Sequence, residues 1–331
     1  MVLASIGSFF DSVGEFFSNL ARVHWPTLIL GLILFGIYLT LRSRAWFHVL
    51  RAAYPDEPFQ WRKIWAAYMA AYGFNNIVPA RGGDVMKLFL TKSTIPKSSY
   101  PALGSTMLVE GIYDLTIAVP VLTFAFTQGV FPKPPDFAKL GAFDLSLFAG
   151  HMKGTLFAIT VLGVAVFVGF AVLSARVRAF WARVKQGFVI LKDRRKYIRE
   201  VWLFQFVGWL FRFSAFWCLL DAFGIGGSVK NVMLVLGCNA VAAVIPFTPG
   251  GAGVVQALLV KCFGSSSVVA AYSVGQQIAV GAFCLGVGFV ALVTVFQFRS
   301  FKEVINAGKE ARAGEDERDV RRGPAEPRAR A

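Results

Sequence analysis

Several charged residues lie inside or at the ends of apolar stretches. Each needs a partner or water there, because inserting one charged side chain into hydrocarbon costs at least about 2.5 kcal/mol. Glu110 and Asp114 are four residues apart, so on a helix they project from one face toward possible arginine partners. The pattern predicts either structural ion pairs or a polar site that holds a phosphate headgroup with the cations and an amine with the carboxylates. The full set is Arg42, Arg81, Asp84, Lys87, Glu110, Asp114 and Arg212.

Two motifs rich in proline and glycine, at 79–87 and 249–257, interrupt apolar segments that no straight helix would continue through. Helices that restart after such breaks expose backbone N–H groups, which can bind a phosphate oxygen or simply form a tight turn. Asparagines beside the breaks either satisfy freed backbone groups or line a polar path. The candidate residues here are Asn76, Gly83, Pro249, Gly250, Gly251, Gly253 and Gln256.

The elements that must position these residues are membrane helices. The chain has 331 residues, of which 56% are hydrophobic and 16% charged, and its apolar stretches are long enough to cross a bilayer about 30 Å thick. We therefore expect an all-α polytopic integral membrane protein. The long spans are expected at 27–48, 101–128, 152–174, 201–221 and 266–297, and shorter segments at 62–79, 83–92, 229–245 and 254–263.

The domain plan follows from these spans. Residues 1–26 are expected to form an amphipathic helix on the membrane surface, and 175–199 a basic amphipathic linker on the cytoplasmic side. Residues 27–174 and 200–297 form two transmembrane repeats, and 298–331 a disordered cytoplasmic tail.

Duplication is indicated by an ungapped offset of 170 residues. At this offset Pro79, Gly83 and Val85 superpose on Pro249, Gly253 and Val255, and Arg42 superposes on Arg212.

The distribution of lysine and arginine predicts how the repeats are oriented. These residues number five in 42–63, four in 81–99, nine in 176–199 and nine in 299–330, but only one in 222–230. The heavy clusters should share the cytoplasmic side, which requires an even number of crossings in each broken segment. With three long spans between the two motifs, the repeats are then inverted, each with a broken or re-entrant helix pair.

Other functional classes find little support. The net charge of +15 is spread between spans, which favours membrane topology and anionic lipids over nucleic acid. The four cysteines and three histidines lack metal-ligand spacing, so we expect no metal and no cofactor. No nucleophile and base are paired by spacing, so we expect that the chain is not an enzyme.

The quoted motifs resemble those of the lysylphosphatidylglycerol synthase transmembrane family, including its standalone members. The matching residues are Asn76-x-x-Pro79-x-Arg81-x-Gly83-Asp84-x-x-Lys87, Glu110-x-x-x-Asp114 and Pro246-x-x-Pro249-Gly250-Gly251-x-Gly253, and the resemblance covers about 27–297. It implies a flippase-like domain of the cytoplasmic membrane that moves anionic or aminoacylated phospholipids, or lipid-linked glycans, between leaflets.

We therefore expect a lipid translocase with a cytoplasmic C-terminus, in which Arg81 grips a phosphate and Glu110 and Asp114 supply counter-charge. The alternative is a non-transporting membrane partner that docks a separate glycosyltransferase or lipid synthase through 176–199.

Overall fold

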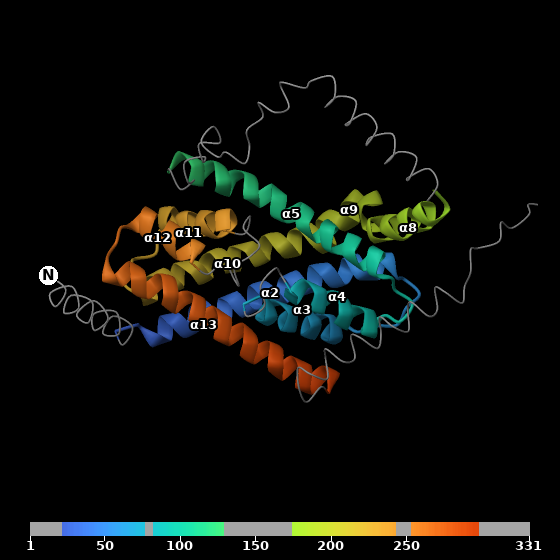
Figure 1. Cartoon of the computed structure of the whole chain (residues 1–331), viewed down its shortest axis with the longest axis horizontal. Helices are drawn as coiled ribbons and strands as arrows, with labels where there is room; N and C mark the ends of the chain where they lie inside the picture. The colour runs from blue at the N-terminus through green and yellow to red at the C-terminus, as the bar shows by residue number, and fades with distance from the viewer. Residues whose placement is uncertain (1–21, 77–81, 129–173, 243–252, 298–331) are drawn as a thin grey trace, which may run out of the picture.

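The computed structural model describes residues 22–76, 82–128, 174–242 and 253–297, and every regular element in these ranges is a helix (Figure 1). Four helical runs are long and apolar enough to cross a membrane. They are α2 (Trp25–Ala53), α5 (Tyr100–Thr127), Arg194–Ala222, and Ser267–Phe296. The protein is a multi-pass, all-helical membrane protein, as the sequence predicts.

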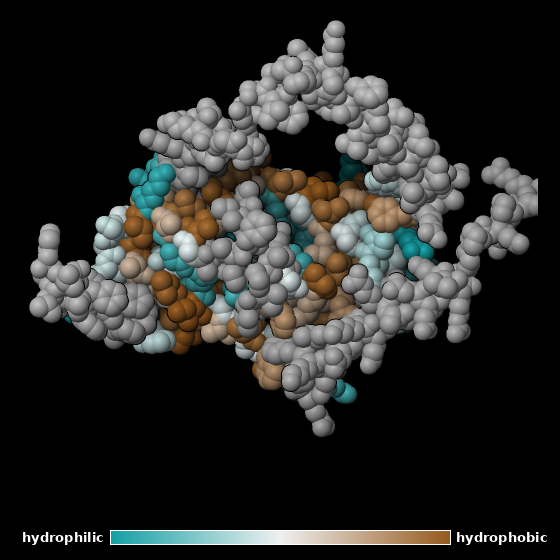
Figure 2. Space-filling model, in the orientation of Figure 1, coloured by the Kyte–Doolittle hydropathy of each residue, from teal (hydrophilic) through white to brown (hydrophobic). Residues whose placement is uncertain are grey.

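The outward faces of these helices carry large apolar side chains. Ile33 on α2, Val119 on α5 and Ile278 on α13 (Ser267–Ala291) are each more than half exposed. Figure 2 shows such hydrophobic residues spread over the visible surface of the bundle. A water-soluble protein rarely leaves so much contiguous apolar surface uncovered, whereas lipid chains solvate it at no cost.

The remaining apolar helices are short and occur in two pairs. The first pair is α3 (Trp61–Asn75) with α4 (Gly82–Thr94), and the second is α11 (Val229–Ala242) with α12 (Val254–Phe263). The members of each pair pack on each other. With 10 to 15 residues each, these helices are about 15–22 Å long and fall short of a full crossing.

Both ends of the α3–α4 pair lie at one end of the bundle. Glu57, which precedes α3, forms an ion pair of 2.9 Å with Lys97, which follows α4. The hydroxyl of Tyr54 also accepts a hydrogen bond of 3.4 Å from the backbone N–H of Ser99. The chain therefore returns through α3 and α4 to the end at which it entered.

Both ends of the α11–α12 pair also lie at one end of the bundle, and this is the end opposite to that of the α3–α4 pair. The ring of Phe223, before α11, lies 5.7 Å from the ring of Tyr272, near the start of α13. The backbone N–H of His24, before α2, donates to the carbonyl of Ala222 at this same end. The two short pairs therefore open from opposite ends of the bundle.

The helices reproduce the 170-residue offset along the whole folded core. The range Trp25–Ala53 corresponds to Arg194–Ala222, Tyr100–Thr127 to Ser267–Phe296, and each short helix of the first pair to one of the second. Corresponding bounds differ by three residues or fewer once the offset is applied.

The equivalent helices α2 and α10 (Leu203–Ala222) pack against each other in opposite directions. Gly31 lies against Ala215, Tyr38 against Gly208, and the ring of His48 against that of Phe204. The other contacts are reciprocal: α13 of the second half packs on α3 of the first, and α5 of the first packs on α11 of the second. The two halves are thus exchanged by an approximate two-fold relation.

The basic amphipathic linker expected at 175–199 is not one continuous helix. Helix α8 (Ser174–Gly187) ends at a glycine pressed against Ser105 of α5, where a side chain would collide. A short 3₁₀ turn (Val189–Lys192) follows and buries Ile190 in the core. Asp193 then caps α9 (Arg194–Tyr197), which continues through a π-helical turn (Ile198–Trp202) into α10. Part of the linker is therefore packed against the bundle.

Several expectations fall outside the described residues: the N-terminal amphipathic helix, the span at 152–174, the C-terminal tail, and the motif residues Pro79, Arg81, Pro246, Pro249, Gly250 and Gly251.

Candidate functional site

A buried carboxylate, Glu110 of α5, binds two cations and one hydroxyl from three other helices. Its Oε1 accepts hydrogen bonds from Arg42 of α2, at 3.2 Å from Nε and 3.0 Å from Nη2. The same oxygen accepts a third hydrogen bond from the hydroxyl of Tyr68 on α3 at 2.6 Å. The Glu110 side chain is 5% exposed, so these donors replace the water that a buried carboxylate would lose.

Lys87 of α4 binds the other oxygen of this carboxylate. Its Nζ lies 2.7 Å from Oε2 of Glu110, and the lysine side chain is 6% exposed. The ammonium also lies over two aromatic rings, 3.9 Å from the centroid of Trp46 and 4.2 Å from that of Tyr68. Lys87 thus sits in a cage of two ring faces and one carboxylate, the arrangement that proteins use to bind ammonium groups.

Arg42 joins this buried pair to a more accessible carboxylate. Its Nη1 and Nη2 donate to the two oxygens of Asp114 at 2.8 and 2.7 Å, a bidentate pair. The Asp114 side chain is 49% exposed. The two cations and two carboxylates balance one another, and the cluster opens at Asp114.

Helical spacing explains why these residues meet. Tyr38, Arg42 and Trp46 follow one another at intervals of four along α2, so they lie on one stripe of its surface. Tyr38 accepts a hydrogen bond of 3.2 Å from Nη1 of Arg42. The indole N–H of Trp46 donates to the hydroxyl of Thr106 at 3.1 Å, which fixes this stripe against α5.

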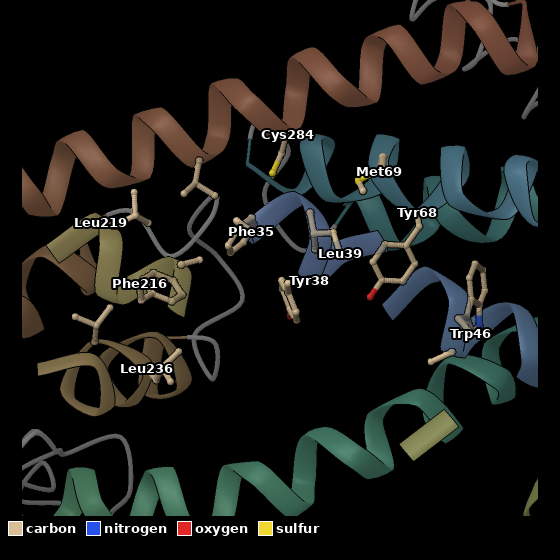
Figure 3. Packing of buried hydrophobic residues seen from close by; sticks show 14 of the residues in the cluster. Phe35, Tyr38, Leu39, Trp46, Tyr68, Met69, Phe216, Leu219, Leu236 and Cys284 are labelled. Carbon is tan, nitrogen blue, oxygen red and sulfur yellow. The ribbon is translucent and has the colours of Figure 1, made fainter. Parts of the chain in front are cut away.

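Arg212 of α10, which is equivalent to Arg42 at the offset of 170, has different neighbours from Arg42. Its guanidinium lies 5.5 Å from the ring centroid of Tyr38 and 5.8 Å from that of Phe216. Phe35, Tyr38 and Phe216 lie close together where α2 meets α10 (Figure 3). The Nε of Arg212 is buried without a hydrogen-bond acceptor, and no carboxylate of the described ranges pairs with this arginine.

The backbone donors at the two helix restarts are already used within the protein. The N–H of Gly83 donates to Oδ1 of Asn75 at 2.8 Å, and the N–H of Gly253 donates to Oε1 of Gln256 at 2.5 Å. Asn75 also donates to Asp84 at 3.2 Å. These two N–H groups already donate to side-chain oxygens at the helix starts, so neither is available to a phosphate oxygen in this structure.

Asn76 satisfies the end of α3, since its amide donates to the carbonyl of Tyr72 at 2.9 Å. Gln256 links α12 to α13 by donating from its amide to Gln277. Both residues serve the broken helix pairs in the way expected for polar residues beside freed backbone groups.

The structure therefore brings together Arg42, Lys87, Glu110 and Asp114, while Asp84 and Asn76 lie at the α3–α4 break. Lys87 pairs with Glu110, as the ion-pair alternative of the sequence analysis predicts. Sequence reasoning missed the aromatic residues Tyr38, Trp46 and Tyr68. The spacing of the first two from Arg42 was a usable signal, whereas nothing in the local sequence distinguishes Tyr68 from other aromatic residues of the core.

The described residues contain no group of three or more histidine, cysteine, aspartate or glutamate side chains suited to a metal ion. The chemistry that the cluster offers is ionic, since it consists of paired cations and carboxylates.

Comparison with known proteins gives one match. The family described as the lysylphosphatidylglycerol synthase TM region matches residues 1–291. No curated protein and no solved structure matches the chain.

Proposed function

Because this chain belongs to the lysylphosphatidylglycerol synthase transmembrane-region family, we propose that it moves polar-headed lipids between the leaflets of the cytoplasmic membrane. The observation that carries this proposal is the buried cluster around Glu110. Four charged side chains are held inside a bundle whose long helices are apolar enough to cross a membrane. Charges at such positions are costly and typically line a substrate path.

The architecture supports transport by alternating exposure. Two halves related by an approximate two-fold exchange meet at the antiparallel pair α2 and α10, and each half contributes a short helix pair that opens from one end of the bundle. In a membrane this arrangement makes inverted repeats, which rock against each other around a shared site. We place the basic end, with the loops at 54–60, 95–99 and 188–193, on the cytoplasmic side.

In this proposal the ion pairs of the cluster are exchangeable. A headgroup entering beside the half-exposed Asp114 competes for Arg42, so the desolvation of the headgroup is offset by charges already inside the protein. We propose transport rather than catalysis, because no nucleophile and base pair belongs to the cluster.

The test is a lipid-scrambling assay in proteoliposomes that contain a fluorescent phospholipid, with a membrane-impermeant quencher added outside. The protein should make inner-leaflet lipid accessible to the quencher. Asp114→Asn should slow this at least tenfold, because the bidentate contact to Arg42 is lost while the half-exposed site tolerates an amide.

Glu57→Gln is the matched control, since it removes a carboxylate that pairs with Lys97 outside the spans, and it should scramble like the unsubstituted protein. If the unsubstituted protein fails to exceed empty liposomes with zwitterionic, anionic and aminoacylated lipids alike, the translocase assignment is wrong. Equal scrambling rates for Asp114→Asn and Glu57→Gln would instead show that the cluster takes no part in transport.

A second candidate, an enzyme-docking role, is favoured by the exposure of the basic linker. Burial of Ile190 holds the linker on the bundle, while Arg194 and Arg195 remain exposed. A glycosyltransferase or lipid synthase that co-purifies with the protein, and is lost when Arg194, Arg195 and Lys196 are neutralised, would support this role.

A further inference from the structure

Arg212 is a cation inside the bundle, and it pairs with no carboxylate in the part of the chain that the structure describes. The described residues offer it only ring faces, those of Tyr38 and Phe216, and its Nε is buried without an acceptor. Ring faces attract a cation through their quadrupole. They accept none of the directed hydrogen bonds that the five N–H groups of a guanidinium donate. Arg212 is only partly exposed, and its buried Nε has no acceptor, so an anion beside it would supply the hydrogen-bond acceptors that the rings lack.

The approximate two-fold relation shows which partners are missing. Arg212 is the equivalent of Arg42, and the two guanidinium groups contact the same ring, that of Tyr38, at 5.5 and 5.8 Å from its centroid. The residues equivalent to Glu110 and Asp114, 170 positions later, are Val280 and Cys284. Both are buried, and Cys284 projects from α13 toward this part of the core (Figure 3).

The rest of the cluster is also replaced in the second half. The equivalents of Tyr68 and Lys87 are Cys238 and Ala257, and Trp46 corresponds to Phe216. Of all the charged and hydrogen-bonding residues that surround Glu110, the second half keeps the arginine alone. The cluster of the first half is therefore neutral, and at the equivalent place in the second half the described residues leave one arginine without a carboxylate partner.

We propose that Arg212 binds the phosphate oxyanion of a lipid headgroup. The planar fork of a guanidinium matches phosphate oxygens in a bidentate manner. Inside a membrane, phosphate-bearing lipids are the anions that reach such a depth with their apolar tails solvated. The inference rests on the proposed translocase and deepens it: Arg212 offers the phosphate a cation that pairs with no carboxylate of the described residues, whereas Lys87 and Arg42 are already paired with Glu110 and Asp114 before a headgroup enters.

The experiment measures equilibrium binding to the purified full-length protein in a neutral detergent, followed by intrinsic tryptophan fluorescence. Three probes separate the sources: dihexanoyl phosphatidylglycerol, dihexanoyl glycerol without phosphate, and inorganic phosphate. Arg212→Gln should raise the dissociation constant for the phospholipid about 10- to 100-fold, the loss expected for a hydrogen bond to a charged group. Arg212→Lys should retain part of the affinity.

Two further variants test the role of the missing carboxylate and control for the loss of a positive charge. Cys284→Asp restores the carboxylate that the first half has at the equivalent position, so it should weaken phospholipid binding while leaving the arginine in place. Arg199→Gln removes the same charge from a side chain that is 77% exposed on the same helical run, and it should bind like the unsubstituted protein. Arg212→Lys keeps the positive charge and Cys284→Asp keeps the arginine, so both variants remain informative if Arg212→Gln does not fold.

Phospholipid affinity within twofold of the unsubstituted protein in folded Arg212→Gln overturns the proposal, as does equal affinity for the phosphate-free lipid. Binding of inorganic phosphate without binding of the phospholipid overturns the lipid source. Arginine-dependent phospholipid binding in a protein that does not scramble lipids upholds this site and rejects only the translocase. If Arg212→Gln changes neither lipid scrambling nor phospholipid binding, the translocase is upheld and the phosphate site at Arg212 is rejected.

Discussion

Lys87 and Glu110 form a buried ion pair of 2.7 Å that joins α4, a short helix of the first broken pair, to α5, a long span. The pair ties the position of the broken helix to the charge state of the span. Any movement that separates α4 from α5 must either break this pair or replace one of its members by another ion of the same sign.

Glu110→Leu should strongly destabilise the protein, because Lys87 and Arg42 then lose their shared carboxylate at buried positions. Loss of one partner of a buried pair typically costs about 3–5 kcal/mol. Thermal unfolding in detergent should show a large fall in Tm for Glu110→Leu and partial recovery in the double variant Lys87→Met with Glu110→Leu. A double variant less stable than Glu110→Leu alone would contradict the pairing.

Gly288→Ala should weaken the packing of α13 on α3. A Cβ at this position would lie 2.9 Å from the Cα of Ala70 and 3.0 Å from the carbonyl oxygen of Met69, both backbone atoms that cannot move aside. The matched control is Gly286→Ala on the same helix, where nothing lies within 4 Å of the added carbon. We expect a lower Tm for the first variant and an unchanged or higher Tm for the second, since alanine favours a helix over glycine.

Oxidation should cross-link α11 to α12. The Sγ atoms of Cys238 and Cys262 are 3.7 Å apart, and side-chain rotation must bring them to about 2.05 Å to form a bond. With diamide as the oxidant, the two thiols lose two protons and two electrons, and diamide is reduced to its hydrazine. Mass spectrometry of peptides should find Cys238 bonded to Cys262. Cross-links that involve Cys218 or Cys284 instead would contradict this arrangement of the second pair.

The two ends of the bundle should face opposite sides of the membrane. Single cysteines introduced by Lys97→Cys and Ser265→Cys, in a chain whose own cysteines are replaced, mark the basic end and the opposite end. Both positions are exposed. In intact cells an impermeant maleimide should label the Ser265→Cys protein, and it should label the Lys97→Cys protein only after permeabilisation. Labelling of both in intact cells would reject the assigned topology.

Much of the fold could be read from hydropathy and charge. The spans expected at 27–48 and 101–128 correspond to α2 and α5, and the segment at 254–263 coincides with α12. These helices are set by long apolar runs and by breaks at proline and glycine, which are local signals. The interruption of the linker after Gly187 was not predictable, because it depends on the close approach of α5 to that glycine, a tertiary contact.

The candidate site likewise has a part that local spacing predicts and a part that depends on tertiary packing. The spacing of Glu110 and Asp114 predicts a shared arginine, and the structure supplies Arg42. That Glu110 in particular is the partner of Lys87 was not anticipated, because the lysine ends the motif at 79–87 and its direction depends on how α4 packs on α3. The offset of 170 also contains the replacement of two carboxylates by Val280 and Cys284, but the change gains meaning only when α2 and α10 are seen to face each other.

Tyr38 and Gly208 are separated by 170 positions and also touch, since a carbon added to Gly208 would lie 3.6 Å from Cδ2 of Tyr38. This is the one place on the crossing of α2 and α10 where a residue meets its own counterpart. In an assembly of two identical half-length chains, the same side chain would have to face itself here. Two tyrosines would crowd the crossing and two glycines would leave it empty. When the two halves are joined into one polypeptide, a tyrosine in one half can face a glycine in the other. The two equivalent arginines, Arg42 and Arg212, can likewise have different neighbours.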